Sequence, residues 1–150
     1  MALPTGRSDR EYKKFIESTS GNVAIRVVPV DASGTPTDTV SLPATTPYFD
    51  SDGDNTAQAL NASATKLYKL SVQNPNASIA FVQIFNAAAG DVIVGTTTPD
   101  YVIPVLGNSA TVEDFVAPLD LGTAATYACT TTATGNGDPS TGLVVSAAYV

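Results

Sequence analysis

The sequence predicts an all-β protein, either an immunoglobulin-like β-sandwich or a jelly-roll-like barrel of about seven to eight short strands. Thr, Ala, Val, Ser and Asn are abundant, and 11 Gly and 10 Pro interrupt the chain, a composition typical of short strands and turns. From residue 57 onward, short apolar segments alternate with turns rich in Gly, Pro and Asn. This is the pattern of a domain built from two packed sheets.

Residues 1–30 are predicted to form an arm outside this domain. Ser8 and Glu11 have the spacing of a capping box, so we expect a short helix over about residues 9–17. A helix of about nine residues is not stable alone in water, so its apolar face must dock on the chain's own domain or on a neighbouring subunit. Residues 22–30 follow as a strand, which Pro29 places at a sheet edge or ends.

Charge divides the chain in the same way. Residues 1–30 carry a net charge of +2, while residues 31–150 carry −9. The acidic part should repel nucleic acid, and the acids interleaved in the arm favour a protein partner. The residues predicted to bind that partner are Arg7, Arg10, Tyr12, Lys13, Lys14, Phe15 and Ile16.

Residues 31–56 are predicted to be an extended acidic connector, because they are interrupted by Pro and contain no basic residue. Within them, Asp50, Asp52 and Asp54 match the first three ligands of a calcium loop. Asn55 and Asn61 stand where that loop requires Gly and Glu. The two interpretations are a weak calcium site and a solvated acidic turn, and no cofactor is predicted.

The β domain is predicted to span residues 57–150. Seven strands are expected, at 65–73, 78–86, 91–95, 100–106, 109–116, 123–131 and 142–150. The segment 78–86 is apolar on both sides, so Phe81 and Phe85 need a second buried surface, either between subunits or within one chain, under the N-terminal arm. Tyr127 lies two residues before Cys129, the spacing of an immunoglobulin tyrosine corner, although no second Cys exists.

The sequence offers no catalytic site. His is absent, so Ser–His and Cys–His catalysis and zinc sites built from Cys and His are unavailable. Glu113 and Asp114 are neighbours in a strand, so they point to opposite faces. No phosphate-binding loop and no apolar segment near ~18 residues, the length of a membrane span, occurs. We expect a non-enzymatic protein made in a cytoplasm, with neither nucleic-acid nor membrane partners.

Two parts of the chain, the N-terminal arm and the β domain, contain stretches that resemble known proteins. The opening GRSDREYKKFIESTSGNVAIRVVPVDASG is similar to the beginning of small structural proteins of tailed bacteriophages. The stretch TKLYKLSVQNPNASIAFVQIFNAAAGDVIVGTTTPDYVIPVL, together with ATVEDF and LDLGTAATYACTTTAT, resembles virion β-modules of the same kind.

The resemblance implies a virion structural protein that is made in the bacterial host and assembles with the major capsid protein or other virion proteins. A decoration or cement protein on the capsid is favoured, as a homo-oligomer for which a trimer is one arrangement. A tail, neck or fibre component is the alternative. A carbohydrate-binding module is a second alternative, with Tyr48, Phe49 and Tyr101 as its candidate aromatic residues.

Overall fold

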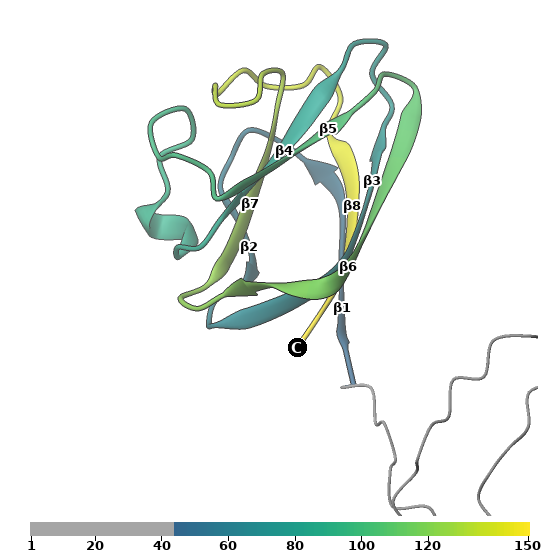
Figure 1. Ribbon diagram of the computed structural model, residues 1–150. Coiled ribbons are helices and arrows are strands. Elements are labelled where there is room, and N and C mark those ends of the chain that lie inside the picture. The colour runs from purple at the N-terminus through teal and green to yellow at the C-terminus, as the bar shows by residue number, and fades with distance from the viewer. Residues whose placement is uncertain (1–43) are drawn as a thin grey trace, which may run out of the picture. The chain divides into compact units, whose positions relative to one another are not determined.

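The computed structural model describes residues 44–150, which form a domain of eight strands (Figure 1). The arm and the connector up to residue 43 lie outside the described residues. The strands are β1 Thr46–Gly53, β2 Gln58–Asn61, β3 Thr65–Asn74, β4 Ala80–Phe85, β5 Tyr101–Val105, β6 Ser109–Leu121, β7 Ala125–Thr130 and β8 Leu143–Tyr149. One 3-10 turn, η1, covers Ala89–Asp91.

The strand pairing identifies the architecture as a jelly roll. Strand β1 pairs with β8, β2 with β7, β3 with β6 and β4 with β5, all antiparallel. The chain is therefore one long hairpin folded over into two sheets, ordered β1-β8-β3-β6 and β2-β7-β4-β5. This is the eight-stranded, two-sheet arrangement of jelly rolls. Of the two predicted architectures, the structure has the jelly roll rather than the immunoglobulin-like sandwich.

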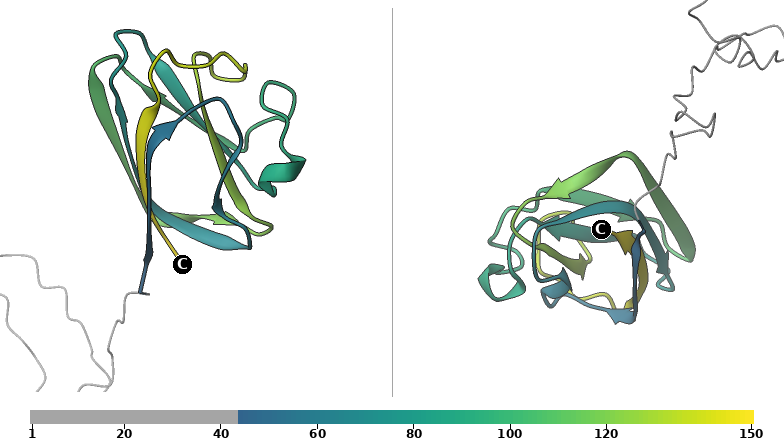
Figure 2. Two further views of the ribbon diagram at one scale, coloured as in Figure 1. Left: turned by 180° about the vertical axis from the view of Figure 1, so that it is seen from behind. Right: turned by 90° about the horizontal axis from the view of Figure 1, so that it is seen from below.

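The hydrophobic core lies between the two sheets, which enclose it in the end-on view of Figure 2. Leu70 and Val72 of β3 face Val82 and Ile84 of β4, and all four are buried. Leu67 is also buried, although strict alternation would place it on the opposite side of β3 from Leu70. A register shift between Leu67 and Lys69 turns both leucines inward.

Two segments differ from the sequence prediction. Residues 46–53, predicted as part of the connector, form β1 and pair with β8, so the domain begins before residue 57. Their acids and Pro are compatible with a strand because β1 lies at a sheet edge, where side chains reach water. Residues 91–95, predicted as a strand, form part of a loop, because Val92 packs on the outside of a sheet instead of pairing.

Tyr127 does not form a tyrosine corner. In that motif the hydroxyl bonds to nearby backbone, whereas the Tyr127 hydroxyl contacts side chains of β1, 77 and 79 residues away in sequence. The spacing to Cys129 therefore reflects two positions that both face the core.

The two ends of the domain differ. Thr46 pairs with Tyr149, so the chain enters the domain beside its C-terminal strand. Figure 1 shows the C-terminus at this end, while the turns between β3 and β4 and between β7 and β8 lie at the opposite end.

Candidate functional site

The outward side of the β2-β7-β4-β5 sheet is covered by two loops of the same chain. Gln83 of β4 is fully buried, and its amide nitrogen donates to the hydroxyl of Thr130 (2.8 Å) and the carbonyl of Gly135 (2.9 Å). The loop that follows β7 therefore lies over β4. Farther along the strand, Phe85 is buried against Val92 and Ala128, under the loop between β4 and β5.

The two loops also touch each other. Gly95 has a φ of 84°, a conformation that favours Gly, and a Cβ there would lie 2.9 Å from the Cβ of Asn136. Figure 1 shows both loops on the side of the domain that carries β4 and β7. The two loops that cover this sheet face are therefore an integral part of the fold of the domain.

This cover decides where Phe85 lies. Phe85 is 1% exposed and is buried within one chain, against Val92 and Ala128 of the domain, whereas the sequence interpretation named the N-terminal arm as its cover. Phe85 is thus not available to a neighbouring subunit. Phe81 points to the same side but is only half-buried, so its part in a subunit interface stays a prediction.

The outward side of the β1-β8-β3-β6 sheet, which we call the open face, has no such cover among residues 44–150. Its position follows from the register, because Leu70, Val72, Val145 and Ala147 point into the core and their neighbours along each strand point outward. One row across the open face consists of Phe49, Ser146, Ser71 and Val112, and the next consists of Pro47, Ala148, Lys69 and Asp114.

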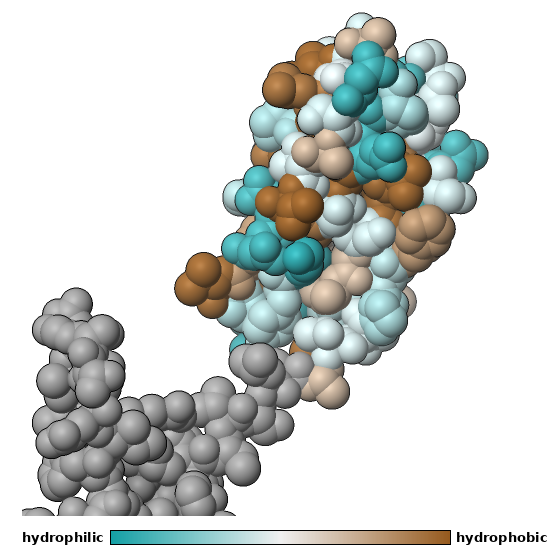
Figure 3. Space-filling view, turned by 90° about the vertical axis from the view of Figure 1, so that its right-hand side faces the viewer, coloured by the Kyte–Doolittle hydropathy of each residue, from teal (hydrophilic) through white to brown (hydrophobic). Residues whose placement is uncertain are grey.

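The open face displays isolated apolar side chains on a surface of small residues. Phe49 is 67% exposed and Val112 is 52% exposed, at opposite ends of one row. The two Ser residues between them have short side chains, so the middle of the row is shallow. Figure 3 shows the side of the domain that carries β3 and β6, where apolar patches stand among polar ones. The open face is a candidate interaction surface because it is an uncovered sheet surface that carries these two exposed apolar side chains.

Both lysines of residues 44–150 lie on the open face. The amine of Lys69 lies 3.2 Å from a carboxylate oxygen of Asp114. Lys66 stands directly opposite Asp120 in the register of β3 and β6. Exposed ion pairs of this kind add only about 0–1 kcal/mol to stability. Their larger effect is to offset two of the acids on this side of an acidic domain.

Three of the four edge strands, β1, β2 and β5, resist pairing with a further strand, whereas the fourth, β6, has 13 residues. Pro47 in β1 and Pro104 in β5 lack a backbone donor, and β2 has only four residues. The backbone N–H of Asp52 donates to the side chain of Asp50 at 2.9 Å, which occupies one more edge donor. Pairing of a further strand at the edges formed by β1, β2 and β5 is therefore not expected.

A polar cluster ties β1 to β7 across the core. The hydroxyl of Tyr127 donates to a carboxylate oxygen of Asp50 (2.5 Å) and lies 3.1 Å from the hydroxyl of Tyr48. Burial, followed by the hydrogen bonds to Asp50 and Tyr48, raises the pKa of Tyr127 far above its usual range. Burial and the nearby Asp50 and Asp54 raise the pKa of the Cys129 thiol to about 12, so this thiol is not a nucleophile at neutral pH.

The three aspartates of the predicted calcium loop do not share a site. Asp50 accepts hydrogen bonds from Tyr127 and from the backbone of Asp52, while Asp54 accepts one from the backbone of Thr56 (2.8 Å). Within residues 44–150, no three acidic or Cys side chains converge as a metal site requires. The geometry therefore favours the other interpretation, an acidic turn with local hydrogen bonds.

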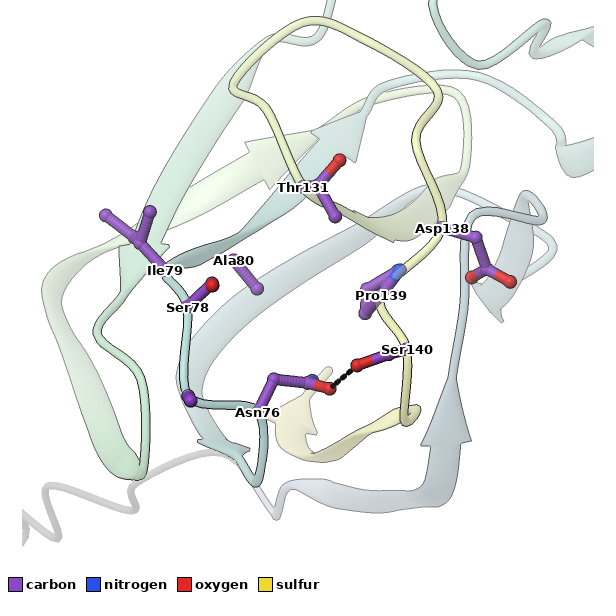
Figure 4. Close-up of a pocket in the computed structure, with 9 residues that line it drawn as sticks. Asn76, Ser78, Ile79, Ala80, Thr131, Asp138, Pro139 and Ser140 are labelled. Atoms are coloured by element: carbon purple, nitrogen blue, oxygen red, sulfur yellow. Dashed lines mark hydrogen bonds between the residues drawn. The ribbon is translucent and has the colours of Figure 1, made fainter.

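A hollow of about 290 Å³ lies at the loop end of the domain, between the β3–β4 turn and the β7–β8 loop. The hydroxyl of Ser140 donates a hydrogen bond of 2.7 Å to the side-chain oxygen of Asn76 across this hollow. The carboxylate of Asp138 points away from the centre of the hollow (Figure 4). No aromatic side chain lines this hollow.

The aromatic residues considered for sugar binding lie elsewhere and apart from one another. Tyr48 is half-buried in the polar cluster with Tyr127, and Phe49 lies on the open face. Tyr101 stacks edge-to-face on Phe115. These positions provide no joint platform for a sugar ring, which weakens the carbohydrate-binding alternative.

The seven arm residues predicted to bind a partner, Arg7 to Ile16, lie outside the described residues. Within residues 44–150, no helix is long and apolar enough to cross a membrane. The open face is a site that the sequence prediction missed. Its residues come from four strands, so only the strand order brings them together.

No protein-family model matches the chain, and no curated protein matches it. The fold is similar to that of the Tobacco streak virus coat protein, with a TM-score of 0.40 and 14% sequence identity, over 73% of this chain and 89% of that one.

Proposed function

We propose that this chain is a non-enzymatic structural protein of a virus particle. The favoured role is a capsid decoration or cement protein of a tailed bacteriophage, which binds the assembled head through residues 1–30. The resemblance of both the arm and the domain to phage structural proteins supports this role. The observation on the structure that carries it is the open face, a whole sheet surface with exposed Phe49 and Val112.

The architecture narrows the alternatives. Jelly-roll domains occur in viral capsid proteins, lectins and cupins, and the fold alone does not choose among them. A metal centre built on imidazole is unavailable because the chain has no His. A sugar site is disfavoured because no aromatic residue lines the loop-end hollow. Assembly with other proteins requires only an exposed surface, and the open face of the domain is such a surface.

The arm supplies the attachment. It carries a net charge of +2 and the apolar residues Tyr12, Phe15 and Ile16, whereas the domain from residue 44 carries −7. Arms of this kind gain affinity when a homo-oligomer links several copies, because the first arm that binds raises the effective concentration of the others at the particle surface. A particle bound by many copies is stabilised by mass action.

The predicted role of the arm in attachment can be tested in a binding experiment. Phage particles purified without the chain are incubated with the full-length protein, and bound protein is measured after sedimentation. Phe15→Asp places a charge on the apolar side of the predicted helix and is expected to reduce binding at least tenfold. The matched control, Ile93→Asp, adds the same charge at an exposed position of the β4–β5 loop and should leave binding unchanged.

Two results would contradict the proposal. Equal binding of Phe15→Asp and the full-length protein would show that the arm is not the attachment. No binding of the full-length protein at all would argue against the capsid role and favour the tail, neck or fibre alternative, which is then tested on purified tails.

A further inference from the structure

The loop between β7 and β8 contains a dipeptide that occurs nowhere else in the chain. Of the eight asparagines in the sequence, only Asn136 is followed by Gly. Asparagine is chemically labile in proteins, because the backbone nitrogen of the following residue can attack its side-chain amide. Glycine has no Cβ that would shield this nitrogen or restrict the backbone around it. The pair Asn136–Gly137 is therefore the most reactive asparagine position that the sequence contains.

The structure leaves the reacting groups of this pair free. Asn136 and Gly137 lie outside both sheets and are exposed, so water reaches them. Their carbonyl oxygens accept hydrogen bonds, from the side-chain amide of Asn55 (2.7 Å) and from the backbone N–H of Thr131 (2.9 Å) respectively. Within residues 44–150, however, neither the side-chain amide of Asn136 nor the backbone N–H of Gly137 makes a hydrogen bond.

The other asparagines of residues 44–150 are held or shielded. Asn61 and Asn108 make no side-chain hydrogen bond there, but they precede Ala62 and Ser109, whose Cβ atoms hinder the backbone nitrogen. The remaining four hold their side chains in hydrogen bonds, and these are Asn55, Asn74, Asn76 and Asn86.

The pair Asp52–Gly53 shows what the loop position adds. An aspartate followed by Gly can close the same five-membered ring, but Gly53 is buried in β1 and pairs with Leu143. A Cβ on Gly53 would lie 3.0 Å from the sulfur of Cys129, so the backbone has little room to turn. Ring closure is therefore opposed in the strand and open in the loop.

We propose that Asn136 is a site of spontaneous deamidation, with water as the only co-reactant. The backbone nitrogen of Gly137 loses its proton to solvent base and bonds to Cγ of Asn136. The bond between Cγ and Nδ2 breaks, and Nδ2 takes up a proton and leaves as ammonia. Water then adds to either carbonyl carbon of the succinimide ring and opens it, which leaves an aspartate or an isoaspartate at position 136. No atom is oxidised or reduced, and the reaction does not depend on the virion role.

The reaction changes the point at which the two covering loops touch. A Cβ on Gly95 would lie 2.9 Å from the Cβ of Asn136, so the two backbones are close there. An isoaspartate carries the main chain through its Cβ, which adds one atom to the loop and displaces the carbonyl that Asn55 holds. We therefore expect the isoaspartate form to have a looser contact between the loops and a lower melting temperature.

Peptide mapping of the full-length protein tests the modification. The protein is kept at pH 8.5 and 37 °C for two weeks and digested with chymotrypsin, and an unincubated sample is treated in the same way. Cleavage after Tyr127 and Tyr149 releases residues 128–149, in which Asn136 is the only asparagine. This peptide should gain about one dalton and separate into two products. In the control variant Asn136→Gln the gain should be at least tenfold slower, because the ring would need six members.

The peptides that contain Asn61 and Asn108 serve as controls within the same sample. Each should gain mass at least tenfold more slowly than residues 128–149. An unchanged peptide 128–149 after incubation, or equal gains at Asn61 and Asn108, would overturn Asn136 as the site.

The melting temperature tests the effect on the loops. The isoaspartate form carries one more negative charge, because a carboxylate is ionised at neutral pH, so anion exchange separates it from the unmodified protein. The variant Asn136→Asp has the same charge with an ordinary backbone and should melt as the unmodified protein does, whereas the isoaspartate form should melt a few degrees lower. Equal melting of the isoaspartate form and Asn136→Asp would overturn the proposed loosening.

Discussion

The hydroxyl of Tyr127 should make a measurable contribution to stability that depends on pH. Tyr127 is 1% exposed, and its hydroxyl donates to Asp50 and contacts Tyr48. In Tyr127→Phe the ring still fills its place in the core, while the hydrogen bond to a carboxylate is lost. A hydrogen bond to a charged group contributes about 1.5–3 kcal/mol. Since Asp50 is only half-buried and water can solvate it in the variant, we expect a loss of about 2 kcal/mol at pH 7.

The raised pKa of Tyr127 predicts how this loss changes with pH. Below pH 10 the tyrosine is protonated in both the folded and the unfolded protein, so its contribution is fully present. Above pH 10 the unfolded protein releases the proton and the folded protein keeps it, so the free energy of unfolding falls by about 1.4 kcal/mol per pH unit. Tyr127→Phe has no hydroxyl to ionise, so its free energy of unfolding does not fall for this reason. The difference between the two proteins should therefore narrow from about 2 kcal/mol at pH 7 to about 0.6 kcal/mol at pH 11.

Urea unfolding of both full-length proteins at pH 7 and pH 11 measures these differences. Tyr68→Phe is the control, because Tyr68 is half-buried on β3 and its hydroxyl has no hydrogen-bond partner within residues 44–150. It should change stability by less than about 0.5 kcal/mol. Equal stability of Tyr127→Phe and the unmodified protein at pH 7 would refute the role of the polar cluster. A difference that stays constant up to pH 11 would refute the ionisation argument.

Three other predictions follow from the packing of the domain. Leu67→Ala should destabilise the protein by about 2–5 kcal/mol in urea unfolding, because the register shift buries this side chain, whereas Val116→Ala at a fully exposed position should cost less than about 0.5 kcal/mol. Gly107→Ala should lower the melting temperature, because the new Cβ would lie 2.0 Å from the carbonyl oxygen of Ala77, while Gly122→Ala, with no atom within 4 Å, should not. The Cys129 thiol should react with a disulfide reagent at pH 8 only after the protein is unfolded, and fast reaction in the folded state would show that it is not buried.

Strands with a clear alternation of apolar residues could be predicted from the sequence. Segments 65–73 and 78–86 match β3 and β4 to within two residues. β1 could not be recognised, because its acids and Pro are typical of a connector and only its pairing with β8 makes it a strand. The segment 91–95 has strand-like apolar residues, but Val92 packs on Phe85 from outside the sheet. Local pattern does not distinguish an apolar residue that pairs in a sheet from one that covers it.

The candidate site was less accessible to prediction for the same reason. The surplus apolar residues of β4 indicated a second buried surface, which the structure has at Phe85, but the loops that form it are not predictable from periodicity. The open face depends on the cross-strand neighbours of Phe49 and Val112, which lie 63 residues apart in sequence. The ion pair on that face depends on register too, because Lys69 meets Asp114 only after the shift in β3.

The measurement that tests the virion role most directly is the copy number of this chain in purified virus particles, relative to the major capsid protein, by quantitative mass spectrometry. The proposed decoration role predicts hundreds of copies per particle. A count between six and a few dozen would contradict that role and place the chain in the neck, tail or fibres. Complete absence from purified particles would contradict the virion role itself.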